Sequence, residues 1–114
     1  MMELMSPAGS LEGVIAAVRG GADAVYFGTG DFNARRNAKN LEGEDLQEAM
    51  RFCRLRGVKT YVTLNTLLTD RELTRARETV LRLSDLGADA LIVQDLGVAR
   101  MVRAAAPDLP IHAS

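Results

Sequence analysis

The sequence is poor in the residues that build disulfide frameworks, metal clusters and membrane spans. Its one cysteine, Cys53, and its one histidine, His112, are too few for a disulfide framework, a zinc finger or a self-contained iron–sulfur site. We therefore expect no metal site and no cofactor within these 114 residues. The apolar stretches are short and are interrupted by Gly, Asp or Arg, so we expect none to span a bilayer.

An excess of charge of one sign is missing as well. The chain carries 14 basic and 15 acidic side chains, and its formal net charge is −1. This balance gives no global attraction to nucleic acid or to an anionic membrane, so a polyanionic partner would need a local basic patch. Residues 1–4 lack the basic flank and the apolar core of a secretion signal, and we expect a cytoplasmic protein.

What the sequence does contain is a repeated pattern of short β-like runs that follow glycine. The runs 24–27, 58–64 and 90–93 each come shortly after a glycine. Glycine is suited to the place where a helix ends, because it adopts the left-handed C-terminal cap without a Cβ clash. The pattern predicts that a helix precedes each of these strands.

Apolar residues recur at helical spacing between the β-like runs. These stripes begin at Leu11, Leu46, Leu73 and Leu96. Ser10 is a predicted N-cap of the first helix, and Thr69 with Glu72 forms a predicted capping box before the third. Pro107 and Pro110 are expected to end the fourth helix.

With residues 3–5 as the first strand and 111–113 as the last, strands and helices alternate along the whole chain. This alternation predicts a parallel sheet with right-handed crossovers. Each unit is about 30 to 35 residues long, and eight such units would close a barrel. We predict an α/β fold, a parallel (β/α) half-barrel that is TIM-barrel-like, with about four βα units plus a fifth strand. Residues 1–114 would form the N-terminal half of one truncated barrel domain.

An open, doubly wound sheet is the competing fold, since five strands with helices on both faces also make a complete domain. The third strand favours the barrel. Lys59, Tyr61, Thr63 and Asn65 alternate onto one of its faces as a polar row, whereas strands covered on both faces are usually apolar throughout.

Ligands gather at the carboxyl ends of the strands in both folds. The most unusual segment there is 31–40, which combines Arg35, Arg36 and Lys39 with three asparagines, among them Asn40. Such a loop could clamp a phosphate or carboxylate, or it could be a solvated connection. The preceding Gly-Thr-Gly turn lacks the third glycine of a dinucleotide fingerprint, so we expect no nucleotide cofactor.

Polar residues also follow the third, fourth and fifth strands. Asn65 could orient a substrate amide or carboxylate or cap the next loop, and Gln94 with Asp95 could contact substrate or cap the fourth helix. Together with Asp95, His112 and Ser114 supply the residue types of a hydrolytic triad, but nothing in the sequence sets their geometry. We therefore assign no catalytic residue. Cys53 lies on an apolar helical stripe and is expected to be a buried structural thiol.

Six blocks of the sequence together resemble one known family. The blocks are Glu3-Leu4-Met5-Ser6-Pro7-Ala8-Gly9-Ser10, Gly21-Ala22-Asp23-Ala24-Val25-Tyr26-Phe27-Gly28, Phe32-Asn33-Ala34-Arg35 with Asn40, Tyr61-Val62-Thr63-Leu64-Asn65-Thr66, Ala90-Leu91-Ile92-Val93-Gln94-Asp95-Leu96-Gly97 and His112-Ala113-Ser114. They resemble the collagenase-like proteases, family thirty-two of the peptidases of unknown catalytic type, from residue 2 to residue 114.

The resemblance implies more than the residues do. Full-length members are much longer, and this stretch resembles their N-terminal barrel portion. Some relatives hydroxylate bases of ribosomal or transfer RNA, with prephenate as the hydroxyl source, and several hold a four-iron four-sulfur cluster through four downstream cysteines. The resemblance thus implies a parent enzyme of RNA-base hydroxylation. In it, this stretch would line part of the substrate pocket through Arg35, Arg36, Asn40, Asn65, Gln94, Asp95 and His112.

Two alternatives remain open at this point. The parent could be a peptidase of the collagenase type, with a peptide in place of RNA as its substrate. The stretch could instead be an inactive structural fragment that forms a homo-oligomer through unpaired sheet edges. In either case we expect the isolated stretch to be inactive.

Overall fold

The computed structural model describes residues 3–28, 41, 43–64, 70–93 and 96–113. Strands and helices alternate along these residues in the predicted order. They are β1 (Met5–Pro7), α1 (Leu11–Arg19), β2 (Ala24–Gly28), α2 (Gly43–Leu55), β3 (Lys59–Leu64), α3 (Asp70–Asp85), β4 (Ala90–Val93), α4 (Leu96–Ala105) and β5 (Ile111–Ala113).

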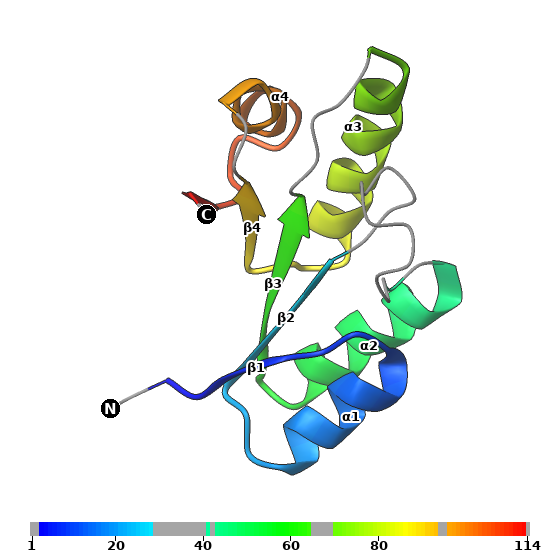
Figure 1. Ribbon diagram of the computed structural model, residues 1–114, viewed down its shortest axis with the longest axis vertical. Coiled ribbons are helices and arrows are strands. Elements are labelled where there is room, and N and C mark those ends of the chain that lie inside the picture. Colours follow the sequence, from blue (N-terminus) through cyan, green and yellow to red (C-terminus); the bar gives the residue numbers. More distant parts are fainter. Residues whose placement is uncertain (1–2, 29–40, 42, 65–69, 94–95, 114) are drawn as a thin grey trace.

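The five strands form one parallel sheet in the order β1-β2-β3-β4-β5. The spatial order never reverses, so right-handed crossovers carry all four helices to the same face of the sheet (Figure 1). A doubly wound sheet needs a reversal of strand order to place helices on both faces. The competing fold is therefore excluded, and the predicted half-barrel is confirmed.

The hydrophobic core lies between the sheet and its helices. Every second residue of β2 and β3 points into it, and Val25, Phe27, Val62 and Leu64 are all buried there. Each helix contributes side chains from one stripe to the same cluster, for example Leu83 of α3. Burying a side chain of this size stabilises a fold by about 1.5–3 kcal/mol, and the period of two leaves the other face of the sheet free for function.

The turns that lead from helix to strand repeat one geometry. In the second of them, the Val58 N–H donates to the Cys53 carbonyl at 2.9 Å and the Gly57 N–H donates to the Arg54 carbonyl at 3.2 Å. This is the Schellman pattern, and it requires the left-handed backbone that Gly57 adopts with a φ of 70°. Equivalent bonds occur at Gly21 and Gly87, so the predicted glycine caps are confirmed at all three turns.

An aspartate joins neighbouring strands after two of these turns. The Asp23 carboxylate accepts a 2.8 Å hydrogen bond from the Leu4 N–H, directly before β1. The Asp89 carboxylate accepts a 2.8 Å bond from the Thr60 N–H in β3. The repeated Gly-Ala-Asp sequence therefore ties β2 to β1 and β4 to β3 at the amino ends of these strands.

The first strand is displaced from its prediction. It was expected at residues 3–5, but Ser6 and Pro7 continue the pairing with Val25 and Tyr26. Proline is tolerated there because β1 is an edge of the described sheet. The strand prediction was wrong because the apolar run of residues 4–5 ends before the hydrogen-bonded ladder does.

Two helix caps were predicted from the sequence, and the structure describes one of them. The Ser10 hydroxyl accepts a 3.0 Å hydrogen bond from the Gly13 N–H, which confirms it as the N-cap of α1. Thr69 lies outside the described residues, and so does the side chain of Glu72, so the predicted capping box of α3 stays a prediction.

Candidate functional site

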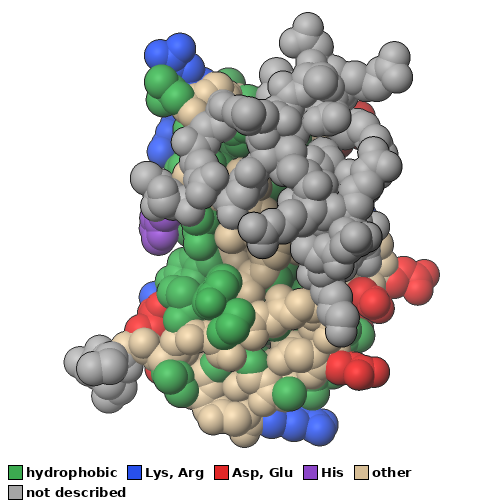
Figure 2. All heavy atoms as spheres, in the orientation of Figure 1, with side chains coloured by type: hydrophobic (Ala, Val, Ile, Leu, Met, Phe, Trp, Pro, Cys, Tyr) green, Lys and Arg blue, Asp and Glu red, His purple; other side chains and the backbone are tan. Residues whose placement is uncertain are grey.

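The face of the sheet opposite the helices, which we call the inner face, carries the candidate site. Its side chains occupy alternate positions along the strands and are half-buried or exposed, apart from small alanines. The larger ones are Met5, Pro7, Tyr26, Lys59, Tyr61, Thr63, Ile92 and His112. In Figure 2, hydrophobic side chains gather on the side away from α1, α2 and α3, with the histidine beside them.

The register of the strands arranges these side chains in rows. Tyr26 pairs with Tyr61, so two tyrosines stand side by side on β2 and β3. One row nearer the carboxyl ends, Thr63 pairs with Ile92, and Ile92 pairs with His112. The confirmed polar alternation of Lys59, Tyr61 and Thr63 thus becomes part of a continuous surface; Asn65 lies outside the described residues.

Tyr61 contacts residues near both edge strands of the sheet, His112 of β5 and Glu3 before β1. Its ring centroid lies 5.8 Å from that of His112, with the two planes inclined by 35°, although β3 and β5 are not paired with each other. Its hydroxyl donates to the Glu3 carboxylate at 3.4 Å. The curvature of the half-barrel brings these residues together, because a flat sheet would hold alternate strands about 10 Å apart.

The environment of Tyr61 keeps its phenol protonated. Burial raises the pKa of Tyr61, and the negative charge of Glu3 raises it further, against a lowering by Lys59. Lys59 and Glu3 form an exposed ion pair at 3.7 Å, of a kind that contributes about 0–1 kcal/mol. Tyr61 can therefore offer a substrate a ring face and an O–H donor, but no phenolate at neutral pH.

Of the residues predicted to line a substrate pocket, the structure describes His112, which is exposed on the inner face. The other six lie outside the described residues: Arg35, Arg36, Asn40, Asn65, Gln94 and Asp95. Each of the six follows the carboxyl end of β2, β3 or β4 in the chain. The Leu41 N–H donates to the Gly28 carbonyl at 3.2 Å, so Leu41 lies beside the carboxyl end of β2.

A hydrolytic triad is untested, since Asp95 and Ser114 lie outside the described residues.

Cys53 is fully buried among apolar side chains, as predicted. Burial raises the pKa of its thiol to about 11, the Asp89 carboxylate adds to this, and Arg56 opposes it. Cys53 is therefore no nucleophile at neutral pH.

The contacts of Tyr61 with His112 and Glu3 were not predicted from the sequence. Alternation along β3 places Tyr61 on the inner face, but it does not reveal which residues of other strands lie beside it. The aromatic character of Tyr26, Tyr61 and His112 at alternating strand positions was the available signal.

The described part of the chain has neither a cluster of metal-ligating side chains nor a helix that could span a membrane. Within that part, no three His, Cys, Asp or Glu side chains come close enough to hold a metal ion. The helices described are also too short or too polar to cross a membrane.

The sequence matches the family model described as Peptidase family U32 over residues 9–114. It is 42% identical over 99% of its length to a 23S rRNA 5-hydroxycytidine synthase of Escherichia coli and 38% identical over 98% to a collagenase of Porphyromonas gingivalis. It is 34% identical over 98% of its length to tRNA hydroxylation protein P1 of Bacillus subtilis. The chain covers 17%, 27% and 26% of these three relatives, respectively.

A solved structure has the same fold. Hydroxymethylglutaryl-CoA lyase of Pseudomonas aeruginosa superposes with a TM-score of 0.72 over 98% of this chain and 44% of its own, at 16% sequence identity. The lyase is a TIM barrel, so this likeness supports the half-barrel architecture alone.

Proposed function

The chain belongs to peptidase family U32, and we propose that it is the N-terminal barrel portion of an enzyme that hydroxylates a base in RNA. In this proposal the inner face forms one wall of the pocket that receives the base. The loops at the carboxyl ends of the strands complete that wall, through Arg35, Arg36, Asn40, Asn65, Gln94, Asp95 and His112.

The similarity to RNA-modifying relatives is the observation that carries the proposal. Relatives named for hydroxylation of ribosomal and transfer RNA match this chain over almost its entire length. The matched portion includes every strand of the half-barrel, so the inner face belongs to what is shared with them.

The chemistry of the inner face suits a nucleobase. An RNA base that leaves its stack is usually held between aromatic or guanidinium planes and by hydrogen bonds to its edges. Tyr61 and His112 offer two aromatic rings whose centroids lie 5.8 Å apart, and the Tyr61 hydroxyl is protonated. With a net charge of −1, the chain has no overall attraction for RNA, so the predicted basic pair Arg35 and Arg36 would have to hold the phosphates locally.

A peptidase is the second candidate, because a collagenase is among the relatives. Its predicted catalytic groups would be His112 with Asp95 and Ser114. The relatives named for RNA hydroxylation outnumber the collagenase and the uncharacterized protease among the similar proteins. We therefore rank hydrolysis below RNA hydroxylation.

A four-iron four-sulfur cluster belongs to the proposal only as a group held elsewhere in the protein. Such a cluster needs four cysteine thiolates, and this chain has one cysteine. Cys53 does not fit the role, because it is fully buried and its pKa of about 11 keeps it a neutral thiol.

The proposal extends to location and assembly. An enzyme acting on ribosomal or transfer RNA would work in the cytoplasm.

The strands β1 and β5 are the edges of the described sheet, and another parallel strand could pair with each of them. In the whole protein we propose that further strands of the barrel cover these edges; an isolated half-barrel would form a homo-oligomer.

Two measurements test the proposal: the modified nucleosides in RNA of a strain that lacks the gene, and the cleavage of gelatin by the purified protein. Ribosomal and transfer RNA from a strain lacking the gene are digested and analysed by mass spectrometry, and the purified protein is incubated with gelatin. We expect a hydroxylated cytidine or uridine to disappear and to return when the gene is restored, with no gelatin cleavage. Unchanged nucleosides together with gelatin cleavage that is lost in His112→Ala would support the peptidase instead.

A further inference from the structure

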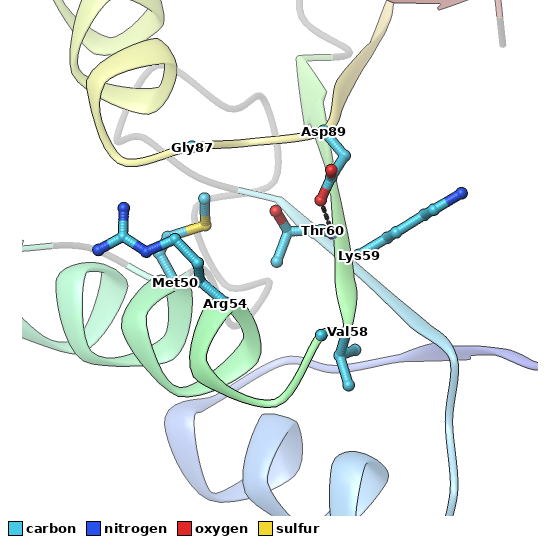
Figure 3. A pocket seen from close by; sticks show the side chains of 8 residues that line it. Met50, Arg54, Val58, Lys59, Thr60, Gly87 and Asp89 are labelled. Atoms are coloured by element: carbon cyan, nitrogen blue, oxygen red, sulfur yellow. Dashed lines mark hydrogen bonds between the residues drawn. The ribbon is translucent and has the colours of Figure 1, made fainter.

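A notch at the amino ends of β3 and β4 lies at the opposite end of the strands from the proposed base pocket. It has a volume of about 190 Å³, and its walls come from the end of α2, the start of β3 and the turn before β4. Figure 3 shows this notch, which we call the lower notch, with Arg54, Thr60 and Asp89 around it. The amino ends of barrel strands are usually devoted to stability, so a hollow with polar walls there calls for an explanation.

The hydroxyl of Thr60 is the first sign that the lower notch binds something. Thr60 is 2% exposed, and its Oγ1 atom has no hydrogen-bond partner among the described residues. Its backbone N–H is satisfied by the Asp89 carboxylate at 2.8 Å, so the hydroxyl alone lacks a partner. Buried side-chain oxygens without a partner are rare in folded proteins. A polar occupant of the notch would supply the missing bond.

Opposite charges stand on two sides of this hydroxyl. Arg54 of α2 lies on one side of Thr60 and Asp89 on the other (Figure 3). The Arg54 side chain runs close to Gly87, since a Cβ added at Gly87 would lie 3.7 Å from its Cδ and Nη1 atoms. Within the described residues, the structure records no ion pair for Arg54 or for Asp89. Asp89 uses one carboxylate oxygen for the Thr60 N–H, so its other oxygen and the Arg54 guanidinium can still contact a ligand.

The side chain of Lys59, the other cationic residue of the wall, points away from the notch. Lys59 contributes to the notch at its backbone, but its side chain points away (Figure 3) and its Nζ atom pairs with Glu3 at 3.7 Å. Met50 and Val58 supply apolar wall beside the two charges. The notch thus offers one cation, one anion, one hydroxyl and a small apolar surface.

We propose that the lower notch binds a small zwitterion, namely a free α-amino acid with a short side chain. Its carboxylate would pair with Arg54, its ammonium group with Asp89, and one of its polar atoms with the Thr60 hydroxyl. A simple anion would be repelled by Asp89 and a simple cation by Arg54, whereas a zwitterion meets a complementary charge at each end. The volume of about 190 Å³ leaves room for a ligand of this size.

L-Alanine is the probe for this site, and nuclear magnetic resonance is the readout. We expect L-alanine to shift the amide signals of Gly57 and Gly87 in the protein saturably. Acetate carries only the carboxylate of L-alanine, and methylammonium carries only its ammonium group. Each should bind the notch at least about tenfold more weakly than L-alanine, as expected for the loss of one charge-assisted hydrogen bond. Equal or stronger binding of acetate or methylammonium, or no saturable shift with L-alanine, would overturn the proposal.

Variants assign the binding to the notch. Arg54→Gln and Asp89→Asn should each weaken L-alanine binding by at least about tenfold, while Arg51→Gln leaves it unchanged. Arg51 is the matched control, because it lies on the same helix and pairs with Glu48 at 3.6 Å outside the notch. A loss of binding in Arg51→Gln equal to that in Arg54→Gln would contradict the site.

Thr60→Val separates a ligand contact from a structural role. This substitution removes the hydroxyl and keeps the shape, so it should maintain or raise the melting temperature of the free protein while weakening L-alanine binding. A lower melting temperature would mean that the hydroxyl is already satisfied in the free protein, and unchanged binding would remove it from the site. Either result contradicts the proposal without touching the proposed RNA chemistry, which lies at the other end of the strands.

Discussion

The ring of Tyr61 lies 5.8 Å from the ring of His112, and the two residues belong to strands that do not pair with each other. Their proximity joins the middle of the sheet to its β5 edge across the inner face. The helices pack on the opposite face, so this pair is available to a substrate and is not needed to fill the main core. The same relationship makes the inner face the best-supported binding surface among the described residues.

The N-cap of α1 should be measurable in the free energy of unfolding. The Ser10 hydroxyl accepts a 3.0 Å bond from the Gly13 N–H, and Ser10→Ala removes it. We expect a loss of about 1 kcal/mol in urea denaturation. Ser84→Ala, at an exposed position near the end of α3, is the control and should change stability by less than about 0.5 kcal/mol. Equal effects of the two substitutions would show that the cap contributes nothing.

The aspartate that joins β1 to β2 should contribute more than a surface carboxylate does. Asp23→Ala leaves the Leu4 N–H without its 2.8 Å partner, and we expect a loss of about 0.5–1.5 kcal/mol, because water can replace part of this exposed bond. Asp108→Ala, in the exposed connection before β5, serves as the control. Hydrogen exchange should also quicken at the amides of β1 in Asp23→Ala, and unchanged exchange there would refute the assigned role.

The left-handed turn at Gly21 predicts a graded response to substitution. Gly21 has a φ of 97°, and no atom lies within 4 Å of the position that a Cβ would occupy, so strain and not crowding should determine the cost. Gly21→Ala should destabilise the fold by about 1–2 kcal/mol. Gly21→Asn should cost less, because asparagine tolerates this region better. A larger loss for Asn than for Ala would indicate crowding.

The buried thiol predicts a loss of stability at alkaline pH. The folded Cys53 thiol ionises near pH 11, against 9.0 for an unperturbed thiol, so between these values the unfolded state has released more protons than the folded state. Stability therefore falls as the pH rises through this window. Cys53→Ala lacks the group, so its unfolding free energy should fall less steeply there. Parallel curves for the two proteins would contradict the raised pKa.

The fold was largely predictable from local signals. The strands at residues 90–93 and 111–113 have the predicted bounds, because glycine or proline marks where each begins. The strands predicted at 24–27 and 58–64 each differ by one residue from β2 and β3, and the first strand departs furthest from its prediction. Its pairing extends to Pro7, since an edge strand has one partner and tolerates a residue without an N–H group. Hydrophobicity, on which the prediction relied, says nothing about that pairing.

The candidate site was predictable only in part, for a physical reason. Alternation along one strand assigned Tyr61 to the inner face, but its approach to His112 depends on the register of β4 with β5 and on the curvature of the sheet. The lower notch was missed for a similar reason, since Arg54 belongs to α2 and Asp89 to the turn before β4, and only the assembled fold brings them to one notch.

The most direct test of the central claim measures RNA hydroxylation by variants of the inner face. Tyr61→Ala and His112→Ala each remove a ring on which a base would stack, and such a ring contributes about 1–3 kcal/mol per base. We expect the kcat/KM for RNA to fall by roughly 5- to 150-fold in each variant, with unchanged thermal stability for His112→Ala, whose side chain is exposed. Leu55→Ala, on the outer surface at 68% exposure, should keep full activity. Full activity in both ring variants would contradict the assignment of the inner face to the base pocket.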